Sequence, residues 1–174
     1  GGRGITGQTT REEDFVEHLF GCNTHDEIMF FTNMGRVFRM KCYRIPEAGR
    51  TAKGTAIVNL LNLKEGEKVT TLFPLWEEGK YLNLITKAGI IKKTPIEEFD
   101  NIRKGGMIAQ NLRDGDELIA AIMTDGSGEI IVGTKKGKSI RFSEGDVRPM
   151  GRSATGVKAI TLEENDSVVG AEKV

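Results

Sequence analysis

Residues 133–139 are the first candidate for chemistry, because they place two glycines, three lysines and a serine in the order of a phosphate-binding loop. In that motif four residues separate the glycines and a helix follows the serine, so that backbone N–H groups and the lysine hold the phosphates of a nucleotide. Here only three residues separate Gly133 from Gly137, and the residues after Ser139 predict a strand. We therefore reject nucleotide binding at this segment.

The remaining reactive residues do not form a recognisable catalytic or metal-binding pattern. His18, His25, Cys22 and Cys42 lack metal-ligand spacing, and Glu12-Glu-Asp14 is typical of a solvated acidic turn. The sequence has no apolar signal segment and no run of about 18 apolar residues. We expect no catalytic residue, no metal, no cofactor, no membrane contact and a reducing compartment. Spacing does not exclude a Cys22–Cys42 disulfide, but buried free thiols are favoured.

The strongest chemical signal is the position of the basic residues. Lysine and arginine together number 25, as do aspartate and glutamate, and the formal net charge is zero. Segments 33–54, 87–106 and 133–158 nevertheless hold 18 of the basic residues and 6 of the acidic ones. These segments therefore carry about +12 and the rest of the chain about −12, which predicts a polyanion partner held through its phosphates.

Duplex DNA is the polyanion we expect, because small and polar residues dominate the basic segments and few aromatic residues are available to stack on single-stranded bases. The predicted DNA-binding residues are Arg3, Arg36, Arg39, Lys41, Arg44, Arg50, Lys53, Lys87, Lys92, Lys93, Arg103, Lys104, Lys135, Lys136, Lys138, Arg141, Arg148, Arg152 and Lys158.

Three sequence markers recur in constant order and define the elements that must position these cations. The first marker is a glycine that follows an apolar run, at positions 35, 89 and 137. The second marker contains Gly54, Gly106 and Gly156. The third marker is acidic and opens with a leucine at 63, 112 and 162. All three markers repeat every 48–54 residues. The chain is thus one repeat domain, 1–174, with approximate units 14–63, 67–112 and 116–162 and the start of another at 166–174.

Each unit predicts four short strands, for example Tyr81–Thr86, Ile90–Lys93, Met107–Asn111 and Leu118–Met123. Asp14–Phe20 is assigned to a strand by its register with Val69–Leu75. The first two strands form a hairpin whose turn needs a glycine with positive φ. A four-stranded sheet of this size cannot bury both faces alone, so neighbouring sheets must stack. The fold class is all-β, a propeller-like array of about three and a half blades, and such a fragment favours self-association or strand exchange between copies.

The chain resembles the C-terminal domain of the bacterial DNA gyrase A subunit over essentially its whole length. The resemblance is carried by residues 12–20, 24–26, 30–39, 45–48 and 50–57 and extends through all three units. It implies a β-pinwheel, usually of six blades with strands exchanged between neighbours, that wraps duplex DNA around a basic perimeter for negative supercoiling. The family's glycine- and arginine-rich box is matched only by its last four positions, Gly1, Gly2, Arg3 and Gly4.

The resemblance also implies a setting. The parent would be an ATP-dependent type II topoisomerase whose catalytic tyrosine, ATP site and Mg²⁺ lie outside this chain. Its partners would be duplex DNA, the rest of the gyrase A polypeptide and the gyrase B polypeptide, in the cytoplasm at the nucleoid. Two alternatives stay open: the similar domain of topoisomerase IV, which generally lacks an intact box, and a propeller-like scaffold whose basic arc meets an acidic protein.

Overall fold

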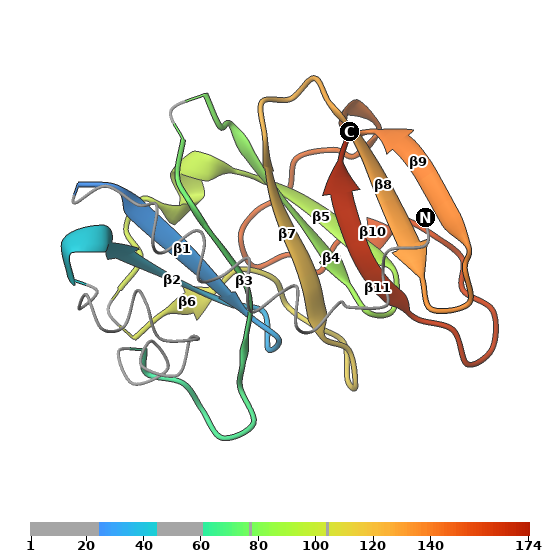
Figure 1. The fold of residues 1–174 in the computed structure, drawn as a ribbon, viewed down its shortest axis with the longest axis horizontal. Helices are drawn as coiled ribbons and strands as arrows, with labels where there is room; N and C mark the ends of the chain where they lie inside the picture. Colours follow the sequence, from blue (N-terminus) through green and yellow to red (C-terminus); the bar gives the residue numbers. More distant parts are fainter. Residues whose placement is uncertain (1–24, 45–60, 77, 104) are drawn as a thin grey trace.

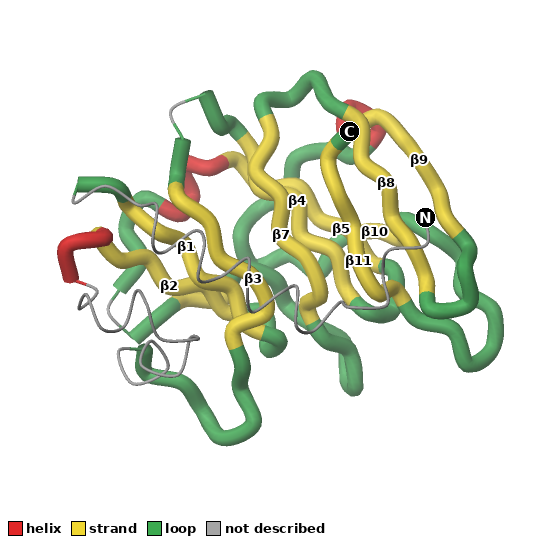
Figure 2. The backbone as a smooth tube through the Cα atoms, viewed as in Figure 1, coloured by secondary structure: helices red, strands yellow, loops and turns green. Residues whose placement is uncertain are grey.

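The computed structural model describes residues 25–44, 61–76, 78–103 and 105–174. Within them the chain forms three antiparallel sheets that follow one another across the molecule (Figure 1). In the part of the chain that the structure describes, helix is limited to short 3₁₀ turns after the second strand of each hairpin, namely η2 (Cys42–Arg44), η3 (Ile96–Phe99) and η4 (Glu144–Asp146) (Figure 2). The prediction of an all-β fold is confirmed.

Each sheet is built on a hairpin from one unit. Sheet A has the order β3-β1-β2-β6, with β1 Glu27–Thr32, β2 Arg36–Lys41, β3 Val69–Pro74 and β6 Met107–Ile108. Sheet B has the order β10-β5-β4-β7, with β4 Tyr81–Thr86, β5 Ile90–Pro95, β7 Leu118–Thr124 and β10 Val157–Lys158. Sheet C has the order β11-β8-β9, with β8 Glu129–Thr134, β9 Ser139–Ser143 and β11 Val168–Lys173. The predicted strand at 107–111 is therefore shorter than expected.

The three hairpin turns use the same local chemistry. Gly35, Gly89 and Gly137 have φ values of 79°, 88° and 89°, as predicted, which side chains with a Cβ rarely adopt. In each turn the glycine N–H donates to the carbonyl of a threonine three residues earlier, at 3.0–3.1 Å. The hydroxyl of that threonine also accepts the N–H four residues on, as from Lys138 to Thr134 at 3.0 Å. The pattern Thr-x-x-Gly thus encodes the turn.

Strands are exchanged between neighbouring units. β6 comes from the second unit but pairs with β2 of the first, with Arg36 opposite Ile108, and β10 comes from the third unit but pairs with β5 of the second. Gly156 enters this junction so closely that a Cβ there would lie 2.3 Å from the Ile91 carbonyl oxygen. Each sheet therefore takes its hairpin from one unit and its outer strands from the next.

The core lies between the sheets, as the stacking prediction requires. One cluster joins Met29 and Phe31 of sheet A to Leu82 and Leu84 of sheet B, and another joins Ile85 and Ile91 of sheet B to residues of sheet C. Backbone bonds reinforce the stacking, because Leu118 N–H donates to Asn33 O at 3.0 Å and Val168 N–H donates to Lys87 O at 2.8 Å. Sheet B is consequently covered on both faces.

The prediction of free cysteines is wrong for Cys42, which is buried and disulfide-bonded. The sequence contains one other cysteine, Cys22, which lies outside the described residues. Sequence spacing could not decide this point because disulfide formation depends on how close the fold brings two thiols. The predicted strand Asp14–Phe20, the box residues Gly1–Gly4 and the cations Arg3, Arg50, Lys53 and Lys104 also lie outside the described residues.

Candidate nucleic-acid interface

The predicted cations divide into two groups according to where the chain carries them. One group lies on the hairpins, in β2, β5 and β9 and the turns that precede them. The other lies on what we call the crossover segments, which begin at the end of each second strand. Segments 95–108, apart from 104, and 143–158 run to the exchanged strands β6 and β10, and segment 41–44 runs from the last residue of β2 to the limit of the described residues. The structure gives the two groups very different surroundings.

The hairpin cations of sheet A are held by neighbouring acids and carbonyls. Arg36 bonds Glu67 at 2.7 Å, with the glutamate side chain fully buried, and its guanidinium lies 4.9 Å from the centre of the Phe38 ring. Arg39 is paired with Glu27, lies 3.8 Å from Asp100, and donates to the Phe99 carbonyl at 3.0 Å. Both side chains therefore stabilise the domain instead of facing solvent as free charges.

The prediction that Lys92 and Lys93 lie on an exposed rim is wrong. Both are buried, because β5 belongs to the middle sheet and has a neighbour on each face. Lys92 donates to three backbone carbonyls, and its burial lowers its pKa to about 8. Lys93 donates to the Glu144 carbonyl at 2.9 Å, and its ammonium lies 4.8 Å from the centre of the Tyr81 ring.

Sheet C repeats this pairing at the surface. Arg141 bonds Glu129 at 2.8 Å, in the position that Arg39 and Glu27 occupy on sheet A. Two turn lysines of sheet C donate to backbone carbonyls, Lys136 to Glu164 and Lys138 to Thr161, the latter at 2.6 Å. On sheet B, the ammonium of Lys87 lies 3.7 Å from the Glu117 carboxylate. Lys135 is the exposed hairpin cation without a side-chain partner in the described part of the chain.

The acidic third marker explains much of this pairing. Its residues Glu67, Asp116 and Asp166 each accept backbone N–H groups, from Lys64 at 2.9 Å, Ala88 at 2.9 Å and Lys136 at 2.9 Å respectively. The last two bonds brace the hairpin turn of the same sheet. Acids that lie about 30 residues away in the sequence are thus next to the turn cations in space. The separation of basic from acidic residues along the sequence therefore does not produce a separate positive surface at the turns.

The crossover cations are exposed and mostly free of partners. Lys41, Arg44, Arg103, Arg148 and Lys158 are all exposed, and none of them makes an ion pair or side-chain hydrogen bond with another described residue. Arg152 is half-buried and donates to the Ile108 carbonyl at 3.0 Å. These residues keep the charge that a phosphate could use.

The crossover segments of successive units also touch each other. Lys41, Arg44 and Ile102 line one groove of about 260 Å³, which joins the first segment to the second. Glu98 of the second segment accepts the backbone N–H of Arg152 in the third at 2.9 Å. Five exposed cations without a partner among the described residues therefore lie on these segments, which together we call the band. Its exposed acids are Glu97, Glu98, Asp100 and Asp146.

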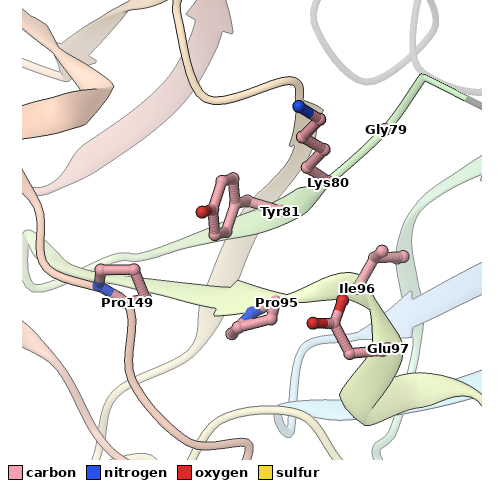
Figure 3. A pocket seen from close by; sticks show the side chains of 7 residues that line it. All are labelled: Gly79, Lys80, Tyr81, Pro95, Ile96, Glu97 and Pro149. Carbon is pink, nitrogen blue, oxygen red and sulfur yellow. The ribbon is translucent and has the colours of Figure 1, made fainter.

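A larger pocket of about 580 Å³ lies beside this band and carries no catalytic set. Gly79, Lys80, Tyr81, Pro95, Ile96, Glu97 and Pro149 line it (Figure 3). Its charged side chains are one lysine and one glutamate, without a nucleophile paired to a base. In the described residues no group of histidine, cysteine, aspartate or glutamate could hold a metal ion, and no helix is long and apolar enough to cross a bilayer.

Comparison with known proteins fixes the family. The family model described as "DNA gyrase C-terminal domain, beta-propeller" matches residues 1–23, 26–75, 80–125 and 128–174. The chain belongs to the DNA gyrase C-terminal domain family. The DNA gyrase A protein of Halalkalibacterium halodurans is 55% identical over 163 residues, and that of Clostridium acetobutylicum is 54% identical over 160 residues. These alignments cover 92% and 91% of this chain but only 20% and 19% of the relatives, so the chain spans about a fifth of their length.

Solved structures of this family share the arrangement of sheets. The C-terminal domain of a DNA topoisomerase IV aligns with a TM-score of 0.78 at 27% identity, over 88% of this chain and 48% of that one. A DNA gyrase A C-terminal domain aligns with a TM-score of 0.72 at 28% identity, over 88% of this chain and 49% of that one. The identification as a gyrase-type C-terminal domain made from sequence is therefore confirmed.

Proposed function

We propose that this chain binds duplex DNA through its phosphates along the crossover segments and bends it, without catalysing any reaction. The observation that carries this proposal is the band of exposed cations, which have no partner among the described residues. Phosphate contacts give affinity without base recognition, so little sequence preference is expected. We propose the bend because the crossover segments pass over three successive sheets, so that a duplex following them would contact each sheet in turn.

The setting we propose is the gyrase A polypeptide in the cytoplasm, with the rest of that polypeptide and the gyrase B polypeptide as partners and negative supercoiling as the activity of the whole enzyme. The gyrase relatives support this, since the chain is 55% and 54% identical to two DNA gyrase A proteins. Cleavage of DNA and use of ATP would belong to parts of the parent enzyme outside this chain.

A salt titration tests the proposal. If about six phosphates are contacted, affinity for a random-sequence 40-base-pair duplex should fall roughly 10³-fold between 50 and 200 mM salt. A duplex of different sequence should give the same curve within about threefold. No binding at 50 mM salt would refute DNA binding, and tight binding to a polyglutamate chain in its place would favour the scaffold alternative.

A further inference from the structure

Lys92 is the most unusual cation of the domain. It lies in β5 opposite Leu84, whose side chain packs in the core between sheets A and B. Its side chain is fully buried, and its ammonium donates to the carbonyls of Ala109, Gly151 and Arg152, the Gly151 bond measuring 3.3 Å. A lysine ammonium has three N–H donors, so all of them are used.

The three carbonyls belong to different parts of the domain. Ala109 directly follows β6, the strand that completes sheet A, whereas Gly151 and Arg152 lie in the crossover segment of the third unit. Lys92 itself belongs to sheet B. One ammonium therefore ties sheet A, sheet B and the third crossover segment together at a single point.

This tie is absent from the other two sheets. Counting from the turn glycine, the residues equivalent to Lys92 are Phe38 and Ile140, which have no donor. Phe38 packs against Gly106, where an added Cβ would lie 2.7 Å from the ring. The repeat can thus close this junction with an apolar side chain, and a lysine here supplies polar bonds that the packing alone does not need.

The charge of this ammonium is adjustable. Burial lowers the pKa of Lys92 to about 8. Two charged groups also act on it: Glu98 of η3 raises the pKa, and Arg152 of the third crossover segment lowers it. The neutral amine that forms above this pKa has two N–H donors for three carbonyls. Exposed lysines and arginines ordinarily keep their charge up to about pH 10.

We propose that Lys92 is a positioning residue that sets the angle between sheets A and B and holds the third crossover segment against them, and so determines how far bound DNA is bent. This rests on the proposed function, since it concerns the geometry of the same binding surface. Lys92 itself does not touch the phosphates, because no part of its side chain is exposed.

The test compares Lys92→Met, which keeps the length and removes the donors, with Lys92→Arg, which keeps donors and charge. Bending is measured by energy transfer between dyes at the two ends of a 40-base-pair duplex, and affinity by anisotropy on the same duplex. We expect Lys92→Met to reduce the bend with less than about a threefold change in Kd and no change in salt slope, because no phosphate contact is lost. Lys92→Arg should restore the bend. A salt slope that falls by about one would overturn the proposal, because it would mean that Lys92 contacts a phosphate directly.

A pH profile of the unmodified chain keeps the proposal testable if the variants fail to fold. The bend should decrease as pH rises from 7 to 9, and in Lys92→Met it should not vary over this range. A constant bend in the unmodified chain across these pH values would overturn the proposal.

Hydrogen exchange separates this proposal from the proposed function, because it requires no DNA. Amides of residues 150–156 should exchange at least about threefold faster in Lys92→Met than in the unmodified chain, while those of β8 stay unchanged. Equal exchange in both proteins would overturn the positioning role. Faster exchange without any DNA binding would leave the positioning role intact and refute only the function.

Discussion

The second strands and the crossover segments both carry lysines and arginines, but the fold places these cations in opposite environments. Cations within β2, β5 and β9 are held by glutamates, carbonyls or aromatic rings, as Arg36 is held by Glu67 and Phe38, whereas Lys41 at the very end of β2 belongs to the crossover group. Cations on the crossover segments, such as Arg103 and Arg148, lie on loops without a facing strand and stay exposed. Position relative to the sheet, more than the number of charges, thus decides which cations are available to a polyanion.

The difference between the two groups of cations has its largest expected effect when the exposed crossover cations are removed. A variant with four of these cations changed to glutamine should bind duplex DNA about 10²–10³-fold more weakly at 100 mM salt. Its salt slope should be lower by about four, one for each lost phosphate contact. The four residues are Lys41, Arg44, Arg103 and Arg148. Anisotropy titrations at several salt concentrations measure both quantities.

A variant with the same change in net charge provides the control. Lys64, Lys68, Lys80 and Arg113 are exposed cations outside the crossover segments, and none of them has a side-chain partner among the described residues. Their change to glutamine should alter the slope by less than about one. Equal losses for the two variants would mean that bulk charge, not the band, attracts the DNA.

The second test loosens the junction that carries the crossover segments. Gly156→Ala should destabilise the domain by about 3 kcal/mol, because the Cβ meets the Ile91 carbonyl oxygen and φ is 114°. Gly137→Ala, at a φ of 89° but in open space, should lose only about 1 kcal/mol. Urea unfolding measures the difference, and equal losses would show that backbone conformation alone, without the close approach, accounts for the effect.

The third test frees a second-strand cation from its partner. Glu67→Gln should lower the free energy of unfolding by about 2 kcal/mol, because Arg36 loses a buried charged partner. The salt slope of DNA binding should not fall, because this substitution removes no cation that contacts a phosphate. In Arg36→Gln, by contrast, a drop in slope of about one would place Arg36 among the phosphate contacts and erase its difference from Arg103.

The smallest expected effect concerns stability at alkaline pH. Folded Lys92 releases its proton near pH 8, whereas an unfolded lysine does so near 10.5, so the unfolded state binds more protons in between. Stability should therefore rise by about 1–2 kcal/mol from pH 8 to 10 through this residue. Lys92→Met should lack this rise in urea titrations, and an identical rise in both proteins would assign it to other groups.

Local elements were predictable from the sequence, and long-range pairings were not. The turn at Gly89 and the strand Tyr81–Thr86 follow from a glycine and a run of apolar residues, both of which act over a few positions. The pairing of β6 with β2 joins residues about 70 apart and has no local signal. The burial of Lys92 likewise has no local signal, because it depends on which sheets stack against β5.

The exchange of β6 and β10 separates the unit that is repeated in the sequence from the unit that folds. A gene duplication that copies 50 residues delivers a hairpin for one sheet together with outer strands for its predecessor. Loss of a single repeat would therefore leave the preceding sheet without the strand on its second-strand edge. Such an array can lengthen or shorten over evolution only if each new repeat supplies a strand for the sheet before it.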